Sequence, residues 1–207
     1  MTRAAKLFPG AIPEYIEFAD EFFAKADFVR YSEDDFWDMI GECRRQLDSI
    51  PIDPYEKHSF PVFRSAISKL STEQLYYAEK HFTRMFIQLY RREIWSAISF
   101  IHGGCSDDSF MDFRQWLMTC GRDPCVSMVE DADNLPAIIS QYKRTTLFSE
   151  GVISYGITNE FEARTGFEIP SEDRVCELQG EWIDEDSVPT KLPNCYLFKQ
   201  QASQPQR

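Results

Sequence analysis

The side chains best suited to chemistry gather in one stretch, which runs from Trp95 to Arg122 and contains the double glycine Gly103-Gly104. One helical pattern ends at the double glycine and a second begins directly after it. Free N–H groups at the start of a helix, together with arginines, favour the binding of an anionic group. In this interpretation, the following residues hold a small ligand: Trp95, Ser106, Arg114 and Arg122.

Two kinds of catalysis would fit the same stretch. Asp107 or Asp108 would serve as a general base beside a bound anion. Cys105 precedes a helix N-terminus, a position that can lower a thiol pKa, and His102 lies just before it as a candidate base. Against both, carboxylates at the helix end repel an anion, and cysteine is often a small buried residue. We therefore expect no catalytic residue.

Metal binding is the third possibility for this stretch. Oxygen and nitrogen ligands would come from His102, Asp107, Asp108 and Asp112. Successive helical residues point about 100° apart, so Asp107 and Asp108 do not face one ion. The cysteines nearby lack the spacing of a zinc site. We expect neither a metal nor another cofactor.

A structural interpretation explains the same residues and is the one we favour. Ser106 or Asp107 would cap the second helix by accepting from its free N–H groups. An aspartate would pair with Arg114 about two turns further on. In this interpretation the polar groups fasten two helices together and perform no reaction.

The elements that position this stretch read as helices. Ser71-Thr72-Glu73-Gln74 is a capping box, and a strong apolar stripe follows it from Leu75 to Leu89. Ser32 is a good N-cap for a helix whose buried stripe is Phe36, Ile40, Cys43 and Leu47. Pro13 opens an earlier helix, Pro51 and Pro54 indicate a loop, and Ser149 caps a late helix that ends at Gly166. The four tryptophans fall beside apolar stripes, which predicts core packing.

The fold class predicted is all-α, with six to eight helices in one irregular or orthogonal bundle. We expect residues 1–199 to form a single domain, in which residues 1–31 hold an extra N-terminal helix and residues 32–166 form the core. Prolines and acids predict an extended C-terminal strap over residues 167–199. Residues 200–207 read as a disordered tail.

Composition excludes several classes of protein. The 207 residues are 43% hydrophobic and 14% aromatic, too apolar for a disordered chain, and suffice for one sizeable core. The formal net charge of −12 opposes binding to nucleic acid or to anionic lipid, both of which require clusters of Lys and Arg. An acidic surface instead favours fast capture of a basic protein.

The expected compartment is the cytoplasm. Six cysteines stand at irregular spacings without a CxxC pair, which favours reduced thiols. The N-terminal residues contain no apolar stretch typical of a secretory signal, and no apolar run reaches the roughly 18 residues of a membrane helix.

The chain resembles a known bacterial family over about residues 32–134, and more weakly as far as Pro193. The motifs that carry the resemblance are Phe36-Trp37-Asp38, Leu70-Ser71, Ile94-Trp95, Gly103-Gly104-Cys105-Ser106-Asp107-Asp108, Phe113-Arg114-Gln115-Trp116-Leu117 and Gly121-Arg122. They are similar to those of the domain of unknown function 4240 family. The resemblance implies membership of this family and no particular activity.

Charge, aromatic content and the lack of a catalytic signature together predict a non-catalytic acidic protein. We expect it to bind a basic protein partner, as an immunity protein or a regulatory protein does. The alternative is a small-ligand enzyme or sensor with an anion-holding pocket between Gly103 and Arg122.

Overall fold

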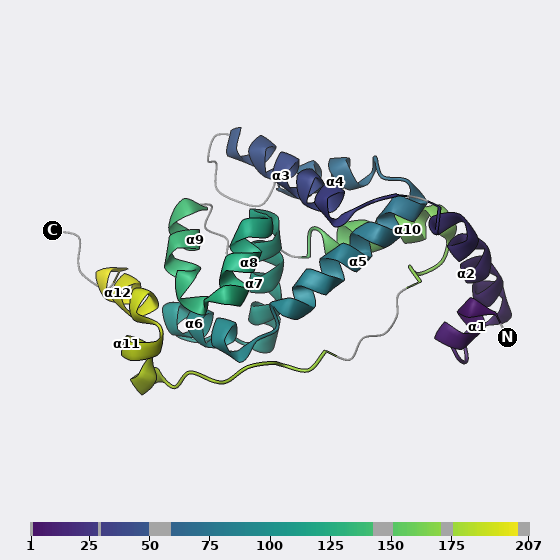
Figure 1. The fold of residues 1–207 in the computed structure, drawn as a ribbon. Coiled ribbons are helices and arrows are strands. Elements are labelled where there is room, and N and C mark those ends of the chain that lie inside the picture. The colour runs from purple at the N-terminus through teal and green to yellow at the C-terminus, as the bar shows by residue number, and fades with distance from the viewer. Residues whose placement is uncertain (1, 29, 50–58, 143–150, 171–175, 203–207) are drawn as a thin grey trace. The chain divides into compact units, whose positions relative to one another are not determined.

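The computed structural model describes residues 2–28, 30–49, 59–142, 151–170 and 176–202. Within these ranges the chain forms twelve α-helices and two 3-10 helices, and Figure 1 shows how the chain runs through them. One isolated bridge joins Arg91 to Gln179 in parallel. Six of the helices have eleven residues or more. The all-α prediction is confirmed. No helix in the described ranges combines the length and apolarity needed to cross a bilayer.

The chain divides into two compact units, and unit 1 comprises Met1–Leu47, Lys57–Thr83 and Gly151–Val175. Its elements are α1 (Arg3–Leu7), α2 (Pro13–Ala26), most of α3 (Glu33–Ser49), α4 (Ser59–Ile67), the first part of α5 (Thr72–Gln88), and α10 (Ser154–Thr165). Its core is aromatic: Phe22 meets Phe161 and Tyr76 edge-on, with ring centroids 5.3 and 5.4 Å away. Such pairs stabilise a core beyond the area that they bury.

Two helices of unit 1 begin at the residues that the sequence predicts as N-caps. The Ser71 hydroxyl accepts from the Gln74 N–H at 3.2 Å, and the Gln74 side chain accepts from the Ser71 N–H at 2.9 Å. This reciprocal pair is the expected capping box. Ser32 caps α3 in the same way with Asp35. The loop predicted at Pro51 and Pro54 and the cap predicted at Ser149 lie outside the described residues.

Unit 2 comprises Asp48–Glu56, Arg84–Glu150 and Cys176–Arg207. Its elements are the end of α5, then α6 (Arg92–His102), α7 (Asp107–Cys120), α8 (Arg122–Glu130), η1 (Ala132–Asn134), α9 (Leu135–Gln141), η2 (Glu185–Ser187), α11 (Val188–Lys191) and α12 (Pro193–Ala202). Every residue of α7 from Phe113 through Cys120 is buried, so this part of the helix lies at the centre of the unit.

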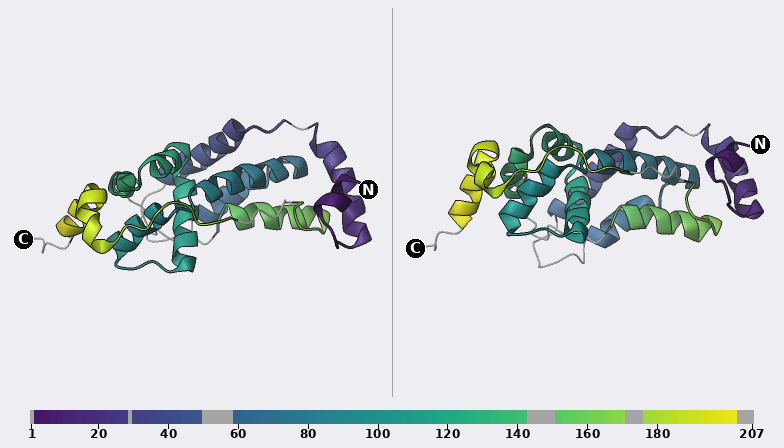
Figure 2. Two further views of the ribbon diagram at one scale, coloured as in Figure 1. Left: turned by 60° about the horizontal axis from the view of Figure 1, so that its bottom comes forward. Right: turned by 90° about the horizontal axis from the view of Figure 1, so that it is seen from below.

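The C-terminal strap is extended only in part. Residues 176–184 run past α6 without forming a helix. The chain then enters η2, α11 and α12 (Figure 2). Gln200 and Ala202, predicted to belong to a disordered tail, lie in α12. Pro189 and Pro193 stand in the first turns of α11 and α12, where proline fits a helix because the first N–H groups are free of helical partners.

Asp133 holds α12 in place within unit 2. Asp133 is 4% exposed, and its carboxylate accepts from the backbone N–H groups of Asn194 and Cys195, each at 2.9 Å. These are N–H groups at the first turn of α12, which have no partner inside the helix. A residue of η1 therefore caps a helix through an N–H group that lies 61 residues later in the chain.

Candidate functional site

The double glycine joins α6 to α7 as predicted. Gly103 adopts the left-handed conformation, with φ at 78°, and ends α6. Ser106 caps α7, because its hydroxyl accepts from the Ser109 N–H at 3.2 Å. Of the two cap candidates, Ser106 therefore makes the bond. Asp107 and Asp108 occupy the first turn of α7 with exposed side chains. Their negative charges favour the positive end of the helix dipole.

Arg114 is buried among aromatic rings. Only 8% of it is exposed, and its guanidinium lies 3.9 Å from the ring centroid of Phe86 and 4.5 Å from that of Tyr90. It also lies 5.1 Å from the Phe110 centroid and donates to the Phe86 carbonyl at 3.0 Å. Three π faces and one carbonyl thus surround the charge.

The prediction that Arg114 pairs with an aspartate is wrong. Arg114 contacts aromatic rings and a backbone carbonyl instead. Burial lowers the pKa of Arg114 to about 10, and Asp107 acts in the opposite direction through space. The guanidinium remains charged at neutral pH, and its neighbours are ring faces, which replace a carboxylate. Its Nε atom is buried without a hydrogen bond among the described residues. The ring contacts and the bond to the Phe86 carbonyl thus give Arg114 a structural role in this part of the chain.

Arg122 lies away from the double glycine. It is the first residue of α8 and is exposed, whereas Ser106 stands at the opposite end of α7. At 1.5 Å per residue, the fourteen residues of α7 separate these ends by about 20 Å. Of the residues predicted to hold one anion, Ser106, Arg114 and Arg122 therefore stand at the start, in the middle and beyond the end of α7.

Burial shifts the pKa values of Cys105 and His102, the candidate nucleophile and base. Burial raises the pKa of the Cys105 thiol to about 11, so the thiolate is scarce at neutral pH. Burial also lowers the pKa of the His102 imidazole. The Cys105 carbonyl accepts from the Trp95 indole N–H at 2.9 Å, which fixes the turn to α6. Among the described residues, no group of three or more His, Cys, Asp and Glu side chains is placed to hold a metal ion.

A groove of about 520 Å³ opens in unit 2 beside the double glycine, and we name it the tryptophan groove. Its walls include Trp95, Phe100, Cys105, Trp182, Glu185 and Lys199. Trp95 stacks on the buried Phe110 at 4.6 Å between ring centroids, and Trp182 lies against Trp95 at 5.5 Å. Trp182 is 51% exposed, so its predicted place in the core is wrong. It forms an outer wall.

Residues 176–187, which we name the acidic segment, carry Trp182 across α6. The Arg92 guanidinium donates to the carbonyls of Leu178 and Gly180, at 2.8 and 2.9 Å. The Glu93 carboxylate accepts from the Glu181 N–H at 2.8 Å. These bonds join the segment to the first turn of α6 and fix the position of the residue that follows, Trp182.

A tight approach at Gly180 completes this attachment. Its φ is 74°, and a Cβ atom built there would overlap the Glu93 carboxylate. Only glycine combines the left-handed conformation with this missing volume. One residue beyond Trp182, the Ile183 N–H donates to the Ser96 hydroxyl at 3.1 Å.

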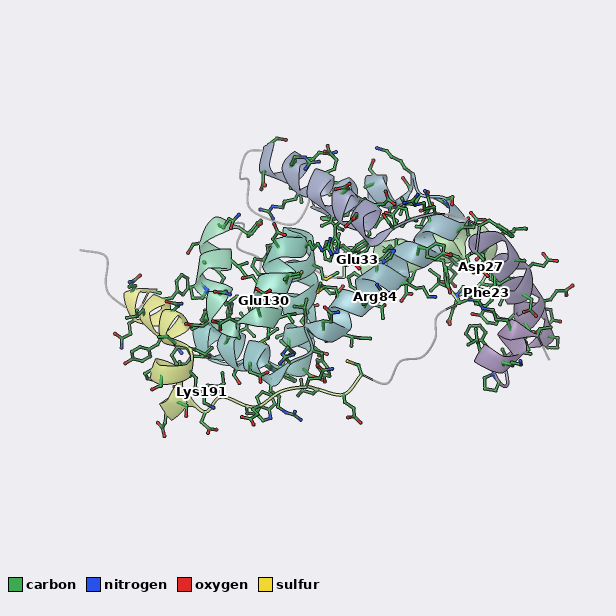
Figure 3. The ribbon with its side chains drawn as sticks, in the orientation of Figure 1. Phe23, Asp27, Glu33, Arg84, Glu130 and Lys191 are labelled. Carbon is green, nitrogen blue, oxygen red and sulfur yellow. The ribbon has the colours of Figure 1, made fainter. Side chains whose placement is uncertain are left out.

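A second groove, of about 360 Å³, lies on the same segment, and we name it the acidic groove. Its charged wall residues are Arg91, Glu93, Glu130, Asp131, Glu181 and Lys191. Figure 3 labels two of them, Glu130 at the end of α8 and Lys191 on α11. Four acidic side chains against two basic ones leave this groove negative.

The sequence interpretation named one wall of the tryptophan groove, at Trp95 and the double glycine, and missed its other wall and the whole acidic groove. Trp182 and the acids around it were assigned to a strap with no site. A signal was present, because a tryptophan stands between Glu181 and the run Asp184-Glu185-Asp186, where an apolar core residue is unexpected.

Comparison with known proteins places the chain in a family. A family model described as a protein of unknown function (DUF4240) matches residues 31–162. No curated protein and no solved structure matches the chain significantly. The matched range contains the whole α6–α7 junction and ends before the acidic segment. Because the match covers more than half of the 207 residues, the chain belongs to the DUF4240 family.

Proposed function

We propose that this protein binds a basic protein partner without catalysis, and that the acidic segment and the tryptophan groove of unit 2 form the docking surface. The observation that carries the proposal is Trp182, a half-exposed indole held over a groove and flanked by carboxylates. Tryptophan is enriched among residues that dominate protein interfaces, where it fills or walls a pocket.

Charge supports a basic partner. The acidic segment contains five carboxylates and no lysine or arginine. Three of them, Asp184, Glu185 and Asp186, are consecutive and exposed. A single-sign field of this kind speeds the approach of an oppositely charged protein and opposes an acidic one.

Lys199 does not reverse the charge of this surface. Its ammonium donates to the Phe100 carbonyl at 2.6 Å and lies 4.4 Å from the Phe100 ring centroid. The charge is thus held against the end of α6, where a cation is favourable to the helix dipole.

The small-ligand alternative has less support. It requires Arg114 and Arg122 to hold one anion, yet Arg114 is enclosed by aromatic rings and Arg122 lies at the other end of α7. The nearby thiol is also protonated at neutral pH, because the pKa of Cys105 is raised. The carboxylates Asp107 and Asp108 stand where an anion would have to dock.

A charge-reversal pair tests the proposal. The first variant is Asp184→Lys/Glu185→Lys/Asp186→Lys, whose side chains make no hydrogen bond among the described residues. The control changes net charge equally in unit 1: Glu14→Lys/Glu17→Lys/Glu21→Lys, on the exposed side of α2. Native-host lysate is passed over the wild-type chain and both variants, and the retained proteins are identified and quantified by mass spectrometry.

We expect a protein rich in Lys and Arg to be retained by the wild-type chain and by the control variant. The acidic-segment variant should not retain it. The purified form of this protein should then bind the wild-type chain less tightly as salt rises. The proposal is overturned if every retained protein binds both variants equally, or if the protein that discriminates between them is acidic.

A further inference from the structure

The two grooves of unit 2 are neighbours that share a wall. Ile183 lines both of them, and it follows Glu181, which lines the acidic groove, and Trp182, which lines the tryptophan groove. Successive residues of an extended segment point to opposite sides, which explains how adjacent side chains serve different grooves. The bond from the Ile183 N–H to Ser96 fixes the shared wall against α6.

The chemistry of the two grooves differs. The tryptophan groove offers the rings of Trp95, Phe100 and Trp182 together with the side chain of Val188. Such a wall gains free energy by covering an apolar side chain. It has one carboxylate, that of Glu185, and one ammonium, that of Lys199, which is already held by Phe100.

The acidic groove offers carboxylates that are available to a cation. Arg91 lies 3.7 Å from the Glu93 carboxylate, so these two charges offset each other. Asp131 accepts from the Asp133 N–H, as the cap of η1. The exposed carboxylates of Glu130 and Glu181 have no hydrogen bond or ion pair among the described residues. A guanidinium or ammonium entering here would meet acceptors that no side chain of this part of the chain uses.

We infer that the partner presents a bipartite segment to unit 2, with an apolar side chain that fills the tryptophan groove and an arginine or lysine that enters the acidic groove. The inference rests on the proposed function and specifies the residue types that dock. The shared wall at Ile183 requires the two anchors to lie close together along one segment.

Defined peptides test this inference on the full chain. The probes are short acetylated, amidated peptides of Gly and Ser that carry one Leu and a pair of Arg, in a series whose Leu-to-Arg separation grows one residue at a time. Two matched peptides replace Leu with Gly, or Arg with citrulline, which keeps the shape and removes the charge. Binding is measured by ¹⁵N chemical-shift titration, which also locates each peptide.

At the best separation, Leu→Gly should weaken binding roughly tenfold or more. Arg→citrulline should weaken it roughly threefold, the scale of an exposed charge pair. The variant Glu130→Gln/Glu181→Gln should abolish the difference between Arg and citrulline and retain that between Leu and Gly. Trp182→Ala should abolish the difference between Leu and Gly and retain that between Arg and citrulline. The control Glu14→Gln/Glu17→Gln should change neither ratio.

Two failures are distinguishable. If the Leu→Gly peptide binds as tightly as the complete one, or if Glu130→Gln/Glu181→Gln leaves the citrulline ratio intact, the bipartite inference is overturned and the proposed function stands. If no Arg-containing peptide shifts any amide of either groove, even at low salt, both are overturned.

Discussion

Asp133→Ala should destabilise the protein more than any exposed carboxylate substitution. The two bonds lost are those from the Asn194 and Cys195 N–H groups, each 2.9 Å long. Asn194 is exposed, so water replaces its bond at a cost of about 1 kcal/mol. Cys195 is completely buried, and leaving its N–H without an acceptor costs about 1–3 kcal/mol. The expected loss is therefore about 2–4 kcal/mol.

Urea denaturation of the full chain measures this loss, and hydrogen exchange at the Cys195 amide locates it. Asp133→Asn keeps one acceptor oxygen, so it should fall between wild type and Asp133→Ala. The matched control is Asp186→Asn, at an exposed residue of η2, with a change of about 0.5 kcal/mol or less. A loss below about 1 kcal/mol for Asp133→Ala would refute the assigned role, because a buried unsatisfied N–H costs at least that much.

Three further predictions concern the junction and the acidic segment. Gly180→Ala should release the acidic segment from α6, because the added Cβ would overlap the Glu93 carboxylate. The control Gly166→Ala has φ at 75° and open space around the new Cβ, so it should cost only the left-handed strain of about 1–2 kcal/mol. Faster hydrogen exchange of the acidic segment in the first variant and not the second checks this, and equal exchange would contradict it. The alkylation rate of Cys105, followed by peptide mass spectrometry, should rise about tenfold per pH unit up to about pH 10. Only the thiolate reacts, and burial raises the pKa of this thiol to about 11. A rate that levels off near neutral pH would indicate an activated thiol and contradict this. Arg114→Ala should cost about 3–4 kcal/mol in urea denaturation, from one charge-assisted bond and three ring contacts, whereas a ligand-binding arginine would leave stability nearly unchanged.

Helix starts are predictable here because their signals are local. The capping box at Ser71 involves only residues three apart in the chain, and the same holds for Ser32 with Asp35. The apolar stripe Phe36, Ile40, Cys43 and Leu47 is fully buried, as its period of 3.6 residues requires.

The C-terminal helices illustrate what a local signal omits. Pro189 and Pro193 belong to the prolines from which an extended strap is predicted, yet both lie in the first turn of a helix, because proline is compatible with a first turn and with no later one. What decides between these outcomes for α12 is Asp133, which caps that helix from a remote part of the chain.

The candidate site depended even more on distant residues. The double glycine and the Ser106 cap were predictable, whereas the aromatic surroundings of Arg114 come from α5, α7 and the residue Tyr90 between α5 and α6. Trp182 contacts Trp95 and is still half exposed, a distinction that hydrophobicity alone does not make.

Docking of a basic segment on the acidic segment of unit 2 is tested most directly by titrating the ¹⁵N-labelled full chain with the Leu and Arg peptide at low and high salt. The expected result is that the Trp182 indole N–H and the Ile183 amide shift most, and that added salt weakens the binding. Shifts confined to unit 1, or binding that salt leaves unchanged, would contradict it.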